Sequence, residues 1–272
     1  MSKIKDEVEK YINEKESTVE YIYLSTGCTL LNVALSGKYD GGLRTGTVVN
    51  PAGYSHAGKS LLAMTILAEA ANDPAFDDYE LYMQDTENGA VFDVIKFFGP
   101  ILDSKSNKIS DSAMERFFTR VTEMTEQGKK FIYVLDSYDG LMCSSDRQRT
   151  KDIQKATNDG KEFKYQDYPR RAQFGHELCR NMVAAISETG SIIINISQAK
   201  DKLNATPYED KKRRAGGSAL DYYTHVMFWL SKGATDTYKE GNVIFRDGHW
   251  VNFDIAKNRI NGRSSKLKLY VK

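Results

Sequence analysis

One segment, residues 53–60, constrains this chain more than any other. It reads Gly-Tyr-Ser-His-Ala-Gly-Lys-Ser and fits G-x-x-x-x-G-K-[ST] at every fixed position, the pattern of a phosphate-binding loop. Its glycines let the backbone turn tightly, so that consecutive N–H groups can hold phosphate oxygens. The lysine would reach the β- and γ-phosphates, and the final serine would bind Mg²⁺. We therefore expect a nucleotide-binding set of Gly53, Tyr54, Ser55, His56, Ala57, Gly58, Lys59 and Ser60.

The context of this segment supports the same interpretation. A short β-rich run, Thr47-Val48-Val49, precedes it, and residues 60–71 read as a buried helix after it. The positive N-terminal end of that helix would strengthen anion binding. A glycine turn that precedes a helix by chance is the alternative, and the strand–loop–helix order argues against it.

Composition limits the class of protein and leaves the partner open. The 272 residues are 40% hydrophobic and 28% charged, which is ordinary for a globular protein, with room for one large α/β domain or two small ones. A net charge of +1 predicts no partner by itself. Cys28, Cys143 and Cys179 form no metal-binding pattern, which favours free thiols in a reducing compartment. With no long apolar run and a charged N-terminus, we expect neither a membrane span nor a signal peptide, and a cytosolic protein.

The periodicity of the chain predicts an α/β fold. Residues 79–85 alternate as a strand, whereas 131–137 and 191–198 are apolar runs typical of buried parallel strands. Helical patterns lie between them, mostly within 90–127 and around 171–188. We therefore predict a mainly parallel central sheet flanked by helices, with ligands at the carboxyl edge of its strands.

The remaining segments define the expected domain organisation. Residues 143–170 and 199–216 are long, charged and without a clear period. The C-terminal part reads as strands near 226–230, 242–246, 250–256 and 266–271. We expect one core domain, residues 25–272, preceded by a short arm, residues 1–24. The arm begins with an amphipathic helix that could dock on its own domain or on a neighbouring protomer.

Three polar side chains are expected at the carboxyl edge of the sheet. Asp136 closes an apolar strand, where it could hold Mg²⁺ together with Ser60; a carboxylate at an ordinary strand-end turn is the alternative. Glu87 is the better candidate for orienting the water that attacks the nucleotide, and Asp85 competes with it. Gln198 ends an apolar strand and could sense the γ-phosphate.

The two charged segments are candidate nucleic-acid contacts. Basic residues interleaved with aromatic ones suit single-stranded DNA, because charges follow phosphates and rings stack on bases. A solvated charge run is the alternative, and acidic neighbours such as Asp201 and Glu209 favour it. The candidate DNA-binding residues are Arg170, Arg171, Lys200, Lys202, Lys211, Lys212, Arg213 and Arg214.

Taken together, several segments in order along residues 25–272 resemble the RecA-type recombinases, particularly their compact phage and bacterial members. They are Ser25-Thr26-Gly27 with Gly41-Gly42-Leu43, Asp85-Thr86-Glu87, Val134-Leu135-Asp136-Ser137, Asn195-Ile196-Ser197-Gln198, Gly216-Gly217-Ser218-Ala219-Leu220 and Ala256-Lys257-Asn258-Arg259. The phosphate-binding loop alone would indicate only an NTPase. The ordered set is far more specific.

The resemblance implies a RecA-like P-loop NTPase core and roles for individual residues. It favours Glu87 as the catalytic glutamate and Gln198 as the switch glutamine, and makes 199–216 the second DNA-binding loop. Lys257 and Arg259 would reach the ATP of a neighbouring subunit. The adenine contacts stay unassigned.

The function implied is an ATP- and Mg²⁺-dependent DNA recombinase, active in recombination and repair, in the host cytoplasm if a phage encodes it. It would form helical filaments on single-stranded DNA and promote pairing and strand exchange with homologous duplex DNA. Two alternatives use the same core: a ring-forming helicase or translocase, and a recombination mediator or regulatory ATPase that neither pairs nor unwinds strands.

Overall fold

A large mixed sheet forms the centre of the molecule. The computed structural model describes residues 21–87, 89, 93–160, 170–201, 212–214 and 219–271. Within these residues ten strands join in the order β12-β11-β10-β3-β7-β6-β4-β5, with β8 beside β3 and β9 beside β8. Their bounds are β3 Thr47–Gly53, β4 Glu80–Asp85, β5 Ser106–Ile109, β6 Phe131–Asp136, β7 Ile192–Asn195, β8 Ser197–Asp201, β9 Lys212–Arg214, β10 Val226–Glu240, β11 Val243–Asn258 and β12 Ser265–Val271.

Most neighbouring strands of this sheet run parallel. The pairs from β10 through β3, β7, β6 and β4 to β5 are all parallel, while β11 and β12 add an antiparallel edge. The predicted α/β fold with a mainly parallel sheet and flanking helices is therefore confirmed at this level. A separate two-stranded sheet pairs β1 (Tyr23–Leu24) with β2 (Leu43–Arg44).

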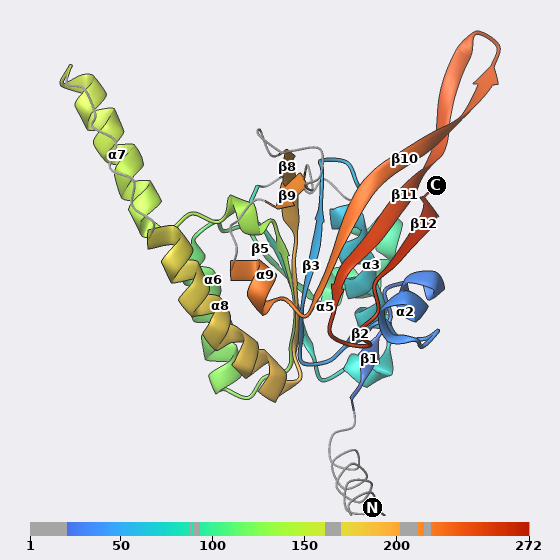
Figure 1. Cartoon of the computed structure of the whole chain (residues 1–272), viewed down its shortest axis with the longest axis horizontal. Coiled ribbons are helices and arrows are strands. Elements are labelled where there is room, and N and C mark those ends of the chain that lie inside the picture. The colour runs from blue at the N-terminus through green and yellow to red at the C-terminus, as the bar shows by residue number, and fades with distance from the viewer. Residues whose placement is uncertain are drawn as a thin grey trace, which may run out of the picture.

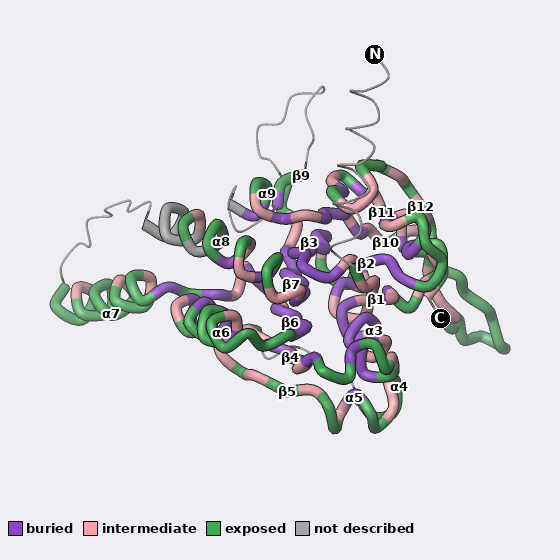
Figure 2. Tube along the Cα trace, turned by 90° about the horizontal axis from the view of Figure 1, so that it is seen from below, coloured by how far each residue is buried: buried purple, intermediate pink, exposed green. Residues whose placement is uncertain are grey.

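Two hydrophobic clusters lie on opposite faces of the sheet, because alternate residues of a strand point to opposite sides. In β6, Ile132 and Val134 join the cluster under α3, whereas Phe131, Tyr133 and Leu135 join the cluster under α6 and α8. The buried strands consequently lie between two helical layers (Figure 2). The helices are α2 Thr29–Ser36, α3 Lys59–Asn72, α4 Val94–Phe98, α5 Pro100–Lys105, α6 Met114–Glu126, α7 Ser144–Asn158, α8 Arg170–Thr189 and α9 Ala219–Tyr223, with 3-10 turns at Pro74–Phe76 and Tyr138–Gly140.

Residues 143–170 differ from the prediction of a long segment without regular structure. Helix α7 occupies Ser144–Asn158 and projects away from the body of the molecule (Figure 1). It buries none of its residues, so its sequence carries no strong apolar stripe to reveal it. Its start is capped by Cys143 and Asp146, which bond each other's backbone N–H groups as a capping box.

The C-terminal strands are longer than predicted. The run expected at 226–230 continues to Glu240, and those expected at 242–246 and 250–256 are one strand, β11. The outer parts of β10 and β11 pair with each other and form a hairpin that extends beyond the sheet (Figure 1). Both strands are exposed in this outer part, so their sequences show little alternation of apolar and polar residues. The stacked rings of Tyr238 and Phe245 are one of the contacts between them.

Two further predictions need correction or lie outside the described residues. The segment 90–127, predicted as mostly helical, also contains the edge strand β5. Residues 1–20 of the expected arm are not described, and its end, Tyr23–Leu24, pairs with β2.

Cys28, Cys143 and Cys179 are free thiols. Among the described helices, none combines the length and the apolar character needed to span a membrane.

Candidate nucleotide-binding site

The glycine-rich segment connects β3 to α3. Strand β3 is buried throughout, and at its end a Cβ atom on Gly53 would lie 2.4 Å from the Leu230 carbonyl oxygen of β10, so that no other residue fits. Gly58 adopts φ 87°, and His56 adopts φ 60°, both in the left-handed region. Close packing of Gly53 against β10 and the left-handed conformations of His56 and Gly58 therefore shape the loop.

Lys59 begins helix α3 and is buried at the centre of the site. Its ammonium donates a hydrogen bond of 2.7 Å to the Tyr54 carbonyl oxygen. Burial lowers the pKa of Lys59, while the charges of Asp136, Glu87 and Asp139 act in the opposite direction. A buried ammonium at the start of a helix is suited to an anionic ligand, because an opposite charge favours its ionised form.

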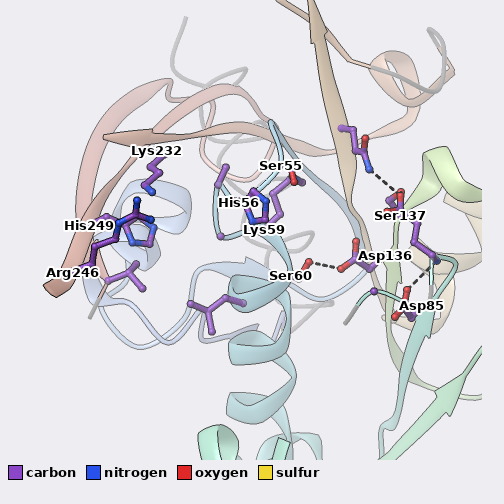
Figure 3. A pocket seen from close by; sticks show the side chains of 17 residues that line it. Ser55, His56, Lys59, Ser60, Asp85, Asp136, Ser137, Lys232, Arg246 and His249 are labelled. Carbon is purple, nitrogen blue, oxygen red and sulfur yellow. Dashed lines mark hydrogen bonds between the residues drawn. The ribbon is translucent and has the colours of Figure 1, made fainter. Parts of the chain in front are cut away.

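Ser60 and Asp136 meet between α3 and β6. The serine hydroxyl donates a 2.5 Å hydrogen bond to Asp136 Oδ2 (Figure 3). Burial raises the pKa of the Asp136 carboxyl group, and Asp85 and Glu87 raise it further, whereas the bond from Ser60 lowers it. A cation beside these oxygens would stabilise the ionised carboxylate, so the residues fit a magnesium ion.

A cluster of three or more His, Cys, Asp or Glu side chains that could hold a metal ion is absent from the described residues. Magnesium in nucleotide sites needs no such cluster, because one or two protein oxygens, phosphate oxygens and water complete its shell.

Glu87 connects three strand ends. One carboxylate oxygen, Oε1, accepts hydrogen bonds of 2.9 Å from the Ser137 hydroxyl and from the Gln198 side-chain amide. Its backbone N–H donates to Asp85 Oδ1 at 3.0 Å. Gln198 is fixed in turn, because its backbone N–H donates to Asp139 Oδ2 at 2.6 Å. The structure thus brings Lys59, Ser60, Asp136, Glu87 and Gln198 together in one place.

These residues line a cleft with a volume of about 980 Å³. Three basic side chains that the sequence analysis missed, Lys232, Arg246 and His249, line the wall formed by β10 and β11. In Figure 3 they lie on one side of Lys59 and His56, and the carboxylates of Asp85 and Asp136 lie on the other. The cleft therefore has one wall with the cations Lys232 and Arg246 and an opposite wall with carboxylates. No local pattern marks these three residues, and the long hairpin that carries them was not predicted.

A smaller apolar pocket of about 410 Å³ adjoins the cleft. The two share Ala57, Gly58, Leu61 and Val271. Aliphatic and aromatic side chains such as Leu62, Val251 and Tyr270 supply much of its lining. Its size and lining suit a planar heterocycle.

Lys257 and Arg259 lie away from this cleft in their own chain. The Lys257 ammonium donates to the carbonyl oxygens of Asp221 at 2.6 Å and Tyr222 at 3.2 Å, and the Arg259 guanidinium donates to Tyr222 O at 3.4 Å. Burial lowers the pKa of Lys257, and the nearby Arg259 lowers it further. The two cations thus meet each other at helix α9, and neither lines the cleft.

The expected DNA-binding residues have different surroundings. Arg213 and Lys200 are exposed, whereas Arg214 is buried and forms a 2.8 Å ion pair with Asp221. The Arg214 guanidinium is therefore not presented to a phosphate, in contrast to the expectation. Lys202 and Lys211 lie outside the described residues, as do the side chains of Lys212, Arg170 and Arg171.

Comparisons with known proteins point in one direction. No family model matches the chain. Protein RecA of Chloroherpeton thalassium is 26% identical over 246 residues, which cover 90% of this chain and 62% of that protein. Protein RecA of Clostridium acetobutylicum is 25% identical over 237 residues, and protein RecA of a Nostoc species is 26% identical over 240, each covering 87% of this chain. The chain is distantly related to RecA proteins. It spans about three fifths of the length of these relatives.

Proposed function

We propose that this chain is an ATP-dependent DNA recombinase that forms filaments on single-stranded DNA and promotes pairing and strand exchange with homologous duplex DNA. The observation that carries the proposal is the contact between Glu87 and Gln198 beside the phosphate-binding loop. This contact joins Glu87, a carboxylate able to orient water, to β8, the strand that leads into the charged segment 199–216. The chain also aligns with RecA proteins over most of its own length.

ATP is proposed to bind with its phosphates on the loop 53–60. Lys59 would hold the β- and γ-phosphates, and Ser60 and Asp136 would supply oxygens to Mg²⁺. When bound, the magnesium ion neutralises charge on the phosphate oxygens. The adenine would occupy the apolar pocket beside Leu62 and Tyr270, because that pocket adjoins the loop and has the volume for a base.

Glu87 is proposed to orient the attacking water and to accept its proton. A γ-phosphate close to Glu87 would compete for the amide of Gln198, which currently donates to Glu87. A change of partner at Gln198 would displace β8, the strand that leads into residues 202–211. DNA affinity would thereby depend on the nucleotide.

Lys257 and Arg259 are proposed to act on the ATP of the adjacent protomer. Their distance from the cleft of their own chain supports this assignment, as does their joint position at one surface site beside α9. A cation supplied by a neighbour would stabilise charge on the transferring phosphoryl group and make hydrolysis depend on assembly.

Electron microscopy of the protein with ATP, Mg²⁺ and single-stranded DNA tests the proposal. Extended helical filaments that need both ATP and DNA are expected. Closed rings would favour a helicase or translocase, and the absence of any DNA-bound assembly would favour a mediator or regulatory ATPase.

A further inference from the structure

Two paired strands form the base of the charged segment 202–211. Strand β8 enters it and β9 leaves it, with Ala199 opposite Arg214 and Lys200 opposite Arg213. The entering strand contacts the nucleotide site directly, through Gln198 and through Asp201, which accepts a hydrogen bond from the Tyr54 hydroxyl. The leaving strand contacts β3, the strand that leads into the phosphate-binding loop, through Arg214.

Arg214 is held at the strand that leads into the phosphate-binding loop. Its side chain is only 2% exposed. One terminal nitrogen donates a 2.6 Å hydrogen bond to Asn50 Oδ1, in β3. The amide of Asn50 donates in turn to the Asn195 carbonyl oxygen and to the Ser197 hydroxyl, on either side of the junction between β7 and β8. Arg214 therefore fixes β9 to the same strands that position Gln198.

The second terminal nitrogen of Arg214 reaches helix α9. It lies 2.8 Å from Asp221 Oδ1, and the backbone carbonyl of Asp221 accepts the hydrogen bond from Lys257. One guanidinium thus links β3, the strand that leads into the nucleotide loop, to the helix on which the interfacial cation Lys257 rests.

The chemistry of this position favours a fixed structural contact over a contact with DNA. A buried guanidinium must keep its partners, because removing one leaves a charge without compensation in a poorly solvated place. Bonding Asn50 and Asp221 at once with two nitrogens also favours arginine, since a lysine ammonium offers a single point of charge. The exposed neighbour Arg213 has no such surroundings.

We infer that Arg214 is a positioning residue that makes the base of the segment 202–211 and helix α9 move as one unit with β3, the strand that leads into the nucleotide loop. A nucleotide-dependent change at Gln198 would then reach both the DNA-binding segment and Lys257. The inference rests on the proposed function and adds to it a coupling residue distinct from Gln198.

The test compares single-stranded DNA affinity in ATPγS and in ADP for wild type and Arg214→Met. The ratio of the two Kd values is expected to fall at least fivefold in the variant, while the affinity for ATPγS without DNA stays within twofold of wild type. Arg214→Lys should give an intermediate ratio. Arg213→Met is the matched control: it should weaken both DNA affinities equally and leave the ratio unchanged.

A wild-type ratio in Arg214→Met overturns the inference, whether or not DNA affinity or Tm falls. If that variant does not fold, Asp221→Asn decides, because the Asp221 side chain is 54% exposed and an asparagine oxygen can still accept a hydrogen bond from Arg214 although the ion pair is lost. It too should lower the ratio, and an unchanged ratio contradicts the inference.

A second readout separates this inference from the proposed function. If wild-type DNA affinity is the same in both nucleotides, the proposed function fails, and hydrogen exchange without ligand judges the linkage alone. Faster exchange in Arg214→Met at both 197–201 and 219–223 supports it, and unchanged exchange overturns it.

Discussion

The Glu87 carboxylate lies 2.9 Å from the side-chain amide of Gln198, although 111 residues separate the two in the sequence. Glu87 comes shortly after the end of β4 and Gln198 shortly after the end of β7, at the edge of the sheet where parallel strands bring their ends together. The same oxygen of Glu87 also accepts a hydrogen bond from Ser137. A single carboxylate thus joins the candidate water-orienting position to the candidate sensor of the nucleotide.

Glu87→Gln should bind ATP and DNA but hydrolyse ATP at least a hundredfold more slowly, because an amide cannot accept the proton of water. Its DNA complexes should therefore outlast those of wild type. Turnover and DNA dissociation rates measure this. Asp85→Asn is the matched control: normal turnover in Glu87→Gln together with its loss in Asp85→Asn would require the two roles to be exchanged.

Arg213→Ala should weaken single-stranded DNA binding and lower its dependence on salt. Each lost phosphate contact removes about 0.7 from the slope of log K against log salt concentration. Titrations at several salt concentrations give the slope. An unchanged slope in a folded variant would mean that Arg213 contacts no phosphate and that the charged segment 199–216 is a solvated surface there.

Stability should fall as the pH drops from 6.5 toward 4, in part because of His225. Burial lowers the pKa of His225 to about 4 from 6.5, helped by Arg259 and Arg44, and its Nδ1 accepts a hydrogen bond from the Val48 N–H at 3.0 Å. Between pH 6.5 and pH 4, His225 binds a proton in the unfolded chain but stays neutral in the folded chain, so acid favours unfolding.

His225→Asn keeps an acceptor and removes this titration. We expect roughly 2 kcal/mol less acid-induced loss in the free energy of unfolding, a value reduced for solvent screening of the ring. Urea unfolding at pH 7 and pH 4.5 measures the difference. Equal losses in both proteins would contradict the assignment.

The sequence predicted the parts of the fold that bury apolar residues. Strands β6 and β7 and helix α3 carry strong patterns because both faces of the sheet are covered. Helix α7 and the outer hairpin of β10 and β11 bury little, and their patterns were correspondingly weak.

The site divides in the same way. Topology brings Lys59, Ser60, Asp136, Glu87 and Gln198 together, because each lies near the carboxyl edge of a parallel strand. The positions of Lys232, Arg246 and His249 depend on the register of a long hairpin with irregular pairing, which no local pattern encodes. Arg214 resembled its exposed neighbour in sequence, and only its contacts with Asn50 and Asp221 distinguish it.

Lys257 and Arg259 should complete the site of a neighbouring protomer. A variant with Lys257→Ala and Arg259→Ala, and a second with Glu87→Gln, should each be nearly inactive. Mixed on DNA, some sites would combine an intact Glu87 with intact cations, and ATPase activity should recover. Arg263→Ala, an exposed change on the turn before β12, is the control and should behave as wild type. No recovery in filaments shown to be mixed would place the cations in their own subunit.

A strand-exchange assay measures the proposed pairing of homologous strands itself. Protein assembled with ATP and Mg²⁺ on a labelled single strand is offered a homologous duplex and, in parallel, a duplex of unrelated sequence. We expect transfer of the label into duplex DNA with the homologous partner only, and none with Lys59→Ala. Filaments that hydrolyse ATP on DNA yet never exchange the homologous strand would contradict the proposed pairing.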